Sequence, residues 1–173
     1  MRTPSVPDCL SLSRVALAPL TAWTLVEGSA VVCVILFGAA VVSDLVDGPL
    51  ARRQHATTRF GTLLDHGADA LYVTTLSATG AWLGLLPPVL PLLITCAFAQ
   101  YALDSRAFTG SGLGRWNGIG YFMLAGALIV VVRFPGAAAF APLLRGLGWV
   151  LLLSTLASML ERAVLARRDP RVP

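Results

Sequence analysis

The chain has 173 residues, of which 56% are hydrophobic and 13% are charged, and its mean hydropathy is +0.75. This composition is too apolar for a soluble domain of that length and indicates an integral membrane protein. The formal net charge of +4 and the pI near 9.5 do not predict a nucleic-acid partner, because the arginines flank hydrophobic runs instead of lining one stripe.

Six hydrophobic segments, each near the length that crosses a bilayer core, predict an all-α fold of six transmembrane helices. Gly, Pro or charged residues mark the breaks between them. Neither an internal repeat nor a second domain is visible, so residues 1–173 form one predicted domain. The predicted spans are Leu10–Val26, Ala30–Arg52, Phe60–Leu86, Val89–Leu103, Trp116–Val132 and Leu144–Ala166.

The first predicted span carries a charge in apolar surroundings. Arg14 lies four residues into this span, where an unpaired guanidinium would be costly. A carboxylate cluster or a substrate phosphate would satisfy that charge. The alternative is that the side chain snorkels to the lipid headgroups.

Four aspartates lie at helical spacing where the second predicted span ends and the third begins. Asp44 and Asp47 are three residues apart, and Asp65 and Asp69 are four apart, so each pair shares one face of a helix. A solvated helix surface would interleave Lys or Arg, whereas the intervening residues here are mainly apolar. Two such helices facing each other would direct four hard oxygen donors at one point, which suits Mg²⁺ or Mn²⁺.

The aspartates belong to a longer pattern, Asp44-x2-Asp47-Gly48-x2-Ala51-Arg52-x8-Gly61-x3-Asp65-x3-Asp69. At every fixed position this pattern resembles the signature of the CDP-alcohol phosphotransferases, D-x2-D-G-x2-A-R-x8-G-x3-D-x3-D. The start of the chain is similar to the P-N-x-x-T-x-x-R opening of that family, with Asp for Asn and Ser for Thr, in Pro7-Asp8-Cys9-Leu10-Ser11-Leu12-Ser13-Arg14.

The resemblance implies a membrane enzyme of phospholipid biosynthesis. Such an enzyme moves a phosphatidyl group from CDP-diacylglycerol to a small hydroxyl acceptor and releases CMP. Asp44, Asp47 and Asp65 would hold two Mg²⁺ or Mn²⁺ ions that bridge the donor diphosphate. Asp69 would be the general base and would also touch the second ion. The resemblance further implies a homodimer surrounded by membrane lipids.

The resemblance also assigns a nucleotide site. Gly48, Ala51 and Gly61 would line the cytidine pocket, where larger side chains would fill the space beside the aspartates. Arg52 would bind the donor diphosphate, because its planar, forked guanidinium matches phosphate oxygens. Close helix packing and an interfacial arginine are the alternatives for these small residues and for Arg52.

The acceptor stays open. Relatives that use glycerol 3-phosphate commonly carry a G-K-x-K-T-type segment at the start of the fifth helix. Here Arg115 replaces the first Lys of that segment, while Asn117 removes the second positive charge. Arg14, Arg106 and Arg115 are the candidate contacts to the acceptor or to a phosphate. Glycerol 3-phosphate, inositol or its phosphate, and other polar head groups are all compatible with the sequence.

The distribution of arginine predicts the topology. If both termini and the loops at 53–59 and 104–115 share one side, that side receives eleven arginines and the other receives two, Arg133 and Arg145. The positive-inside rule then places the termini and the aspartates in the cytoplasm, as a multi-pass protein of a bacterial inner or cell membrane.

Three other functions agree less well with the sequence. A divalent-cation transporter also needs acidic helix pairs, but it does not need the Gly-Ala-Arg part of the pattern. A catalytically inactive membrane subunit is disfavoured by the intact motif. Prenyl-transferring enzymes carry Asp-rich motifs of different spacing or in soluble bundles.

Overall fold

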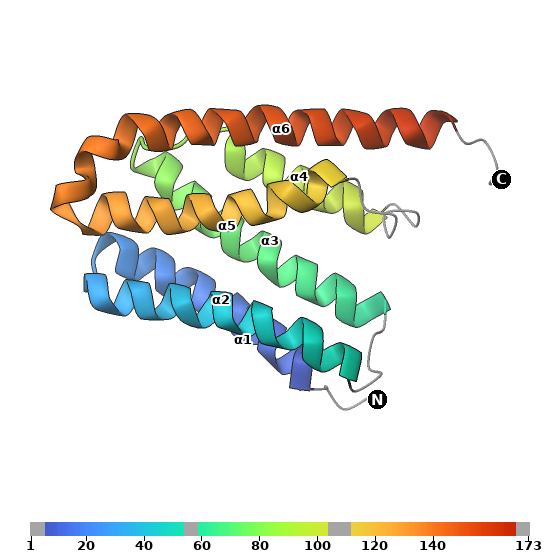
Figure 1. Cartoon of the computed structure of the whole chain (residues 1–173), viewed down its shortest axis with the longest axis horizontal. Helices are drawn as coiled ribbons and strands as arrows, with labels where there is room; N and C mark the ends of the chain where they lie inside the picture. Colours follow the sequence, from blue (N-terminus) through green and yellow to red (C-terminus); the bar gives the residue numbers. More distant parts are fainter. Residues whose placement is uncertain (1–5, 54–58, 104–111, 169–173) are drawn as a thin grey trace.

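A computed structural model of the chain describes residues 6–53, 59–103 and 112–168, and within these ranges it describes the side chains of residues 9–46, 61–103 and 112–164. Six α-helices and one 3₁₀ helix run back and forth in an elongated bundle (Figure 1). The predicted all-α class is therefore confirmed, with the aspartate pattern on the second and third helices. In chain order the elements are α1 (Val6–Val26), α2 (Ala30–Arg53), α3 (Arg59–Trp82), α4 (Leu90–Leu103), α5 (Gly112–Arg133), η1 (Pro135–Phe140) and α6 (Ala141–Arg168).

The bundle has two chemically different ends. At one end α1, α3 and α5 begin and α2, α4 and α6 end (Figure 1); we call it the aspartate end, because the side chains of Asp44, Asp65 and Asp69 lie toward it. At the other, the turn end, short connections join α1 to α2 and α3 to α4, and η1 joins α5 to α6. This alternation agrees with the two-sided division of arginines expected from the sequence.

α1 lies between the two helices that carry the aspartates. It packs against both α2 and α3, whereas α2 and α3 are not packed directly against each other among the described residues. α3 packs next on α4, and α6 covers α4 and α5. Any group shared by α2 and α3 at the aspartate end is therefore approached by side chains of α1.

The third helix ends earlier than the sequence predicted. We expected a span as far as Leu86, but α3 ends at Trp82. Gly84 adopts a φ of 71°, the left-handed conformation that favours glycine and terminates helices. The N–H of Leu85 donates to the carbonyl of Gly80 at 2.9 Å, which closes the final turn. The apolar run after Trp82 is therefore a turn and not a continuation of the helix.

Among the residues that the structure describes, three stretches are long and apolar enough to cross a membrane, namely Cys9–Val26, Gly112–Arg133 and Pro135–Val164. Two shorter apolar helical stretches are Ala30–Val46 and Leu90–Leu103. These five stretches indicate a multi-pass membrane protein. The predicted span at α4 is short, because its 14 residues extend about 21 Å, less than the ~30 Å of a hydrocarbon core. The predicted span at α3 does not reach this apolar standard, because its first half carries two aspartates.

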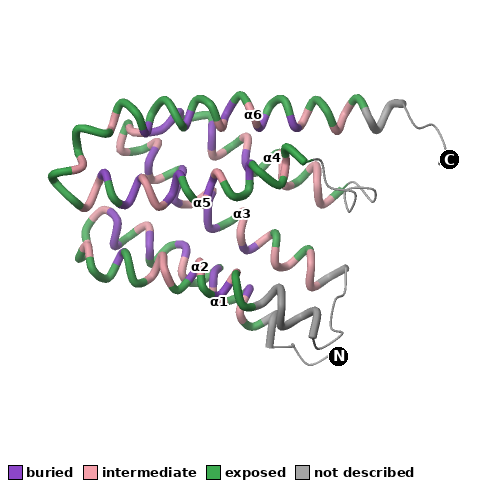
Figure 2. Tube along the Cα trace, in the orientation of Figure 1, coloured by how far each residue is buried: buried purple, intermediate pink, exposed green. Residues whose placement is uncertain are grey.

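The exposed surface is rich in large apolar side chains. Trp82 is 73% exposed, Ile35 62% and Leu153 62%, while Tyr72 and Leu128 are fully buried between helices. Figure 2 shows exposed residues along the outer side of α6 and buried ones where it faces the bundle. A water-soluble monomer rarely exposes so much apolar surface, so these faces suit contact with lipid.

At the turn end both arginines are bound by backbone carbonyls. Arg133 donates to Gly28 and, at 3.4 Å each, to Leu25 and Val26 at the end of α1. Arg145 donates to the carbonyl of Gly84 at 2.6 Å. Cations are stabilising at helix C-termini, where carbonyls lack partners within the helix. These two exceptions to the arginine asymmetry therefore have a structural role.

Candidate functional site

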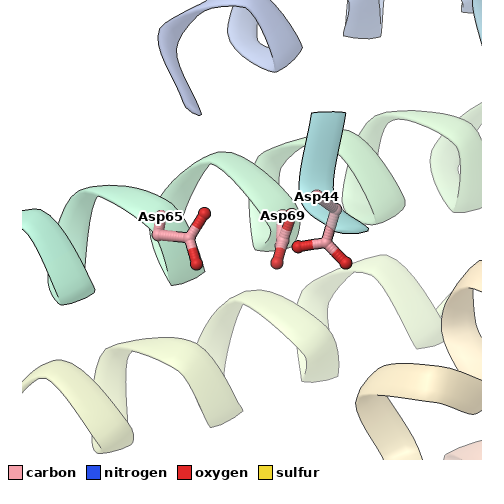
Figure 3. Close-up of side chains that lie close together, drawn as sticks. All are labelled: Asp44, Asp65 and Asp69. Carbon is pink, nitrogen blue, oxygen red and sulfur yellow. The ribbon is translucent and has the colours of Figure 1, made fainter. Parts of the chain in front are cut away.

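Three carboxylates from two helices converge at the aspartate end. Asp65 and Asp69 lie one turn apart on α3, and Asp44 reaches toward them from α2 (Figure 3). One oxygen atom from each residue lies within 4.8 Å of the others. Their side chains are 38%, 28% and 26% exposed for Asp44, Asp65 and Asp69, so the cluster is partly shielded but open to solvent.

A fully buried arginine from α1 contacts all three carboxylates. Nη1 of Arg14 donates to Oδ1 of Asp44 at 2.8 Å and also to Oδ1 of Asp69. Nη2 donates to Oδ1 of Asp65. The Arg14 side chain is 0% exposed, so it does not snorkel to the membrane surface. Of the partners that the sequence allowed for this charge, the structure shows the carboxylate cluster.

Ser11 joins the cluster, although the sequence did not single it out as a site residue. Its hydroxyl donates to Oδ1 of Asp65 at 3.1 Å and accepts from Nη2 of Arg14 at 3.4 Å. Ser11 is 3% exposed. It lies three residues before Arg14 and therefore on the same face of α1. That spacing, within the similarity at the start of the chain, was the signal that could have identified it.

The donor set fits a hard divalent cation. Three carboxylates and one guanidinium leave two formal negative charges, which one such ion would neutralise. Opposite ligands of Mg²⁺ are about 4.2 Å apart at its usual ~2.1 Å bond length. Because the three oxygens already lie within 4.8 Å, small side-chain rotations would complete their approach. Carboxylate oxygens are also the ligands that Mn²⁺ and Mg²⁺ prefer.

The remaining predicted residues divide into two groups. Gly61 is half-buried on α3, one turn before Asp65. Arg115 is exposed near the start of α5, and its side chain makes no hydrogen bond or ion pair with any residue that the structure describes. The others lie outside the described residues or side chains. These are Asp47, Gly48, Ala51 and Arg52, which belong to the helical part of α2, and Arg106 in the chain between α4 and α5.

An aromatic stack supports the same end of α3 from the other side. The ring of His66 stacks on Tyr101 of α4, with centroids 5.1 Å apart and planes at 9°. The guanidinium of Arg162 on α6 lies 6.0 Å from the centre of the Tyr101 ring. Nδ1 of His66 is 3.8 Å from Oδ2 of Asp65. His66 therefore connects the aspartate-bearing turn of α3 to α4 and, through Tyr101, to α6.

The chain is similar over part of its length to several curated relatives. It is 34% identical over 102 residues to the cardiolipin synthase (CMP-forming) of Streptomyces coelicolor, covering 54% of this chain and 46% of that protein. It is 42% identical over 72 residues to the CDP-diacylglycerol--glycerol-3-phosphate 3-phosphatidyltransferase of Pectobacterium atrosepticum, covering 40% of each. It is 33% identical over 84 residues to a probable cardiolipin synthase (CMP-forming) of Drosophila melanogaster, covering 48% of this chain and 26% of that protein. The chain thus matches less than half the length of each of these relatives.

No solved structure matches the chain. The sequence model of CDP-alcohol phosphatidyltransferases, in contrast, matches residues 4–160. That match takes in α1 with Arg14, the whole pattern from Asp44 to Asp69, and most of α6. Because the match covers nearly the whole chain and includes the convergent carboxylates, the protein belongs to the CDP-alcohol phosphatidyltransferase family.

Proposed function

We propose that the protein transfers a phosphatidyl group from CDP-diacylglycerol to a hydroxyl acceptor and releases CMP. The observation that carries this proposal is the convergence of Asp44, Asp65 and Asp69 from two helices within 4.8 Å. The complete signature around these residues and membership of the family support it. In this proposal the cluster of acids lies at the membrane-water boundary, which suits a reaction between a lipid donor and a polar acceptor.

The carboxylates divide the chemistry between them. Asp44, Asp47 and Asp65 would hold two Mg²⁺ or Mn²⁺ ions, which would supply positive charge to the donor diphosphate. Asp69, which would also hold the second ion, accepts the proton of the acceptor hydroxyl, because an alcohol is a poor nucleophile until a base removes that proton. The acceptor oxygen forms its bond to the β-phosphorus of the donor. The bond from that phosphorus to CMP breaks, and CMP leaves with the electron pair.

The nucleotide lies against the pattern between the carboxylates. Gly48, Ala51 and Gly61 leave space for cytidine, and Arg52 binds the diphosphate with its forked donors. These four assignments rest on the sequence signature. The half-buried position of Gly61, one turn before Asp65, is compatible with a ligand beside the cluster.

The acceptor is an alcohol that carries little negative charge. In members that use glycerol 3-phosphate, a second Lys commonly stands where this chain has Asn117. Asn117 is buried and accepts a hydrogen bond from Ser154 of α6 at 2.5 Å, so its side chain belongs to the α5–α6 contact. A dianionic acceptor such as glycerol 3-phosphate would therefore lack the positive partner that the second Lys provides. The acceptor in cardiolipin synthesis is a lipid alcohol whose phosphodiester carries a single negative charge, so it needs that cation less. Glycerol 3-phosphate, held by Arg106 and Arg115, is the second candidate.

The activity is tested by measuring CMP release from CDP-diacylglycerol by the purified protein with Mn²⁺ or Mg²⁺. Phosphatidylglycerol, glycerol 3-phosphate and inositol are supplied separately, and phosphatidylglycerol should give the highest rate. Asp65→Asn should abolish release, whereas Glu161→Gln, which alters an exposed acid of α6 outside the cluster, should retain it. Uptake of Mn²⁺ into proteoliposomes, without CMP release for any acceptor, would instead support a cation transporter.

The aspartate end faces the cytoplasm in this proposal, and the protein functions as a homodimer. The excess of arginine at that end supports the orientation. In a variant without Cys9, Cys33 and Cys96, a cysteine introduced for Ser29, which is exposed at the turn end, should react with a membrane-impermeant reagent in intact cells. A cysteine introduced for Thr57 should react only after lysis. The reverse result would invert the topology.

A further inference from the structure

Among the described side chains, the one cation of the cluster comes from α1, which contributes none of its described carboxylates. Within the described residues, α2 supplies Asp44, α3 supplies Asp65 and Asp69, and α1 supplies Arg14 and Ser11. Because α1 lies between α2 and α3, the guanidinium is the group through which carboxylates of the two helices meet. One nitrogen, Nη1, is shared by Asp44 and Asp69.

That position is also the one that suits a divalent cation. An ion shared by α2 and α3 has to receive oxygens from Asp44 and from Asp65 or Asp69. All three Oδ1 atoms already accept from the Arg14 guanidinium. Two cations in contact repel each other strongly, and more so where water is partly excluded. An ion that binds these Oδ1 atoms therefore competes with the guanidinium for them.

We propose that Arg14 is a built-in counter-ion that competes with the divalent cation for the three carboxylates. It holds α1 to α2 and α3 by neutralising acids that would otherwise repel each other, and it lowers the affinity of the site for metal. This inference rests on the proposed metal-dependent function, and it adds a residue that sets how tightly the metal is held. Arg14 acts through the carboxylates and is a positioning residue.

The opposite role makes the opposite prediction. If Arg14 only oriented the carboxylates, holding one oxygen of each so that the other faced the ion, its removal would weaken metal binding. If it competes, its removal strengthens metal binding. Arg14→Met separates these roles, because methionine fills part of the same buried space without a charge. Arg14→Lys retains the charge but loses the planar fork.

The experiment is a titration of the purified full-length chain in detergent with Mn²⁺, followed by calorimetry. We expect Arg14→Met to bind Mn²⁺ about tenfold more tightly than the unmodified protein, since a competing charge has been removed. Arg14→Lys should stay within about threefold of the unmodified protein. Arg133→Met is the matched control, because it removes an arginine at the far end of the bundle whose partners are backbone carbonyls. Its Mn²⁺ affinity should be unchanged.

Thermal unfolding gives a second readout. In EDTA, Arg14→Met should unfold at a lower temperature than the unmodified protein, and saturating Mn²⁺ should restore most of the difference. Arg133→Met should lose the same stability with and without Mn²⁺. If Arg14→Met folds only with Mn²⁺, the proposal is supported. If Arg14→Met folds under neither condition, Arg14→Lys decides between the roles. A stable Arg14→Lys protein in EDTA with unchanged Mn²⁺ affinity supports competition, whereas a weakened Mn²⁺ affinity contradicts it.

Two results would overturn the inference, and they are distinguishable. Weaker Mn²⁺ binding by Arg14→Met would show that Arg14 orients the ligands and does not compete, while leaving the proposed function intact. No measurable Mn²⁺ binding by the unmodified protein would refute the metal-dependent function itself, and the competition with it.

Discussion

The two ends of the bundle bind arginine in opposite ways. At the turn end, Arg133 and Arg145 donate to the backbone carbonyls of Gly28 and Gly84, which are neutral and lie in the turns that follow α1 and α3. At the aspartate end, Arg14 donates to three carboxylates, which are charged and also suited to a metal ion. The carbonyl partners carry no charge, whereas in the proposed function the carboxylates would exchange one cation for another. The arginines of the turn end thus have a structural role, whereas the buried Arg14 contacts the residues to which we assign the chemistry.

We expect the largest effect from removing the metal, which should act on the aspartate end alone. CMP release should fall to the level of a protein-free control in excess EDTA and return when Mg²⁺ or Mn²⁺ is added, because the donor diphosphate then regains its positive partners. Arg145→Met, which changes only the turn end, should keep both the activity and its dependence on metal. Full activity in EDTA would remove the metal from the mechanism.

Substitutions within the aspartate end should separate the base from the ligands. Asp69→Asn should slow single-turnover CMP release by about two to four orders of magnitude, because it removes the proton acceptor. It should leave much of the affinity for CDP-diacylglycerol, measured by calorimetry, in place. Asp44→Asn and Asp47→Asn should weaken donor binding, since the diphosphate is held largely through the ions.

The same pair of measurements shows how this assignment would be wrong. Near-normal turnover in Asp69→Asn would exclude Asp69 as the base. Equal loss of donor binding in Asp69→Asn and Asp44→Asn would mean that Asp69 is mainly a metal ligand. Glu161→Gln is the control for the loss of an acid elsewhere on the aspartate-end surface.

Substitutions at the turn end should lower the stability of the protein and leave its activity unchanged. Arg133→Met leaves the carbonyls of Leu25, Val26 and Gly28 without their cationic donor, which should cost about 1–3 kcal/mol of stability. Thermal unfolding in detergent measures this loss, and the activity per folded molecule should not change. A changed metal dependence in this variant would show that the two ends are coupled.

Local spacing explains why the convergence of Asp65 with Asp69 could be predicted. Residues four apart on a helix share a face whatever the helix packs against. The signature extended that inference to Asp44 on α2, and the structure confirms that these three side chains meet. Asp47 stays a prediction, because its side chain lies outside the described part of the chain. The same holds for the nucleotide residues Gly48, Ala51 and Arg52.

Long-range pairing is what the sequence could not decide. Whether Arg14 snorkels or pairs depends on which helices flank α1, and that is a property of the tertiary fold. Ser11 was passed over for the same reason, since its partner Asp65 is 54 residues away. The end of α3 was wrong because hydrophobicity continues past Trp82, whereas the helix is terminated by the backbone conformation of Gly84.

The smallest effect we expect is at that glycine. An alanine Cβ at Gly84 would meet no atom within 4 Å, so Gly84→Ala tests the backbone alone. Its φ of 71° is a left-handed conformation that costs an L-residue roughly 1–2 kcal/mol. We therefore expect a loss of stability of about 1 kcal/mol in thermal unfolding, with unchanged CMP release.

Gly146 on α6 is the matched control, because a Cβ there also meets open space but the backbone is helical. Gly146→Ala should leave stability unchanged or raise it by about 0.5–1 kcal/mol, since alanine is the better helix former. Equal effects of the two substitutions would mean that the turn after α3 tolerates alanine and that Gly84 does not end the helix. A loss of activity in Gly84→Ala would show that a change at the turn end alters the carboxylate cluster. We do not expect this, because the two ends of the bundle are far apart.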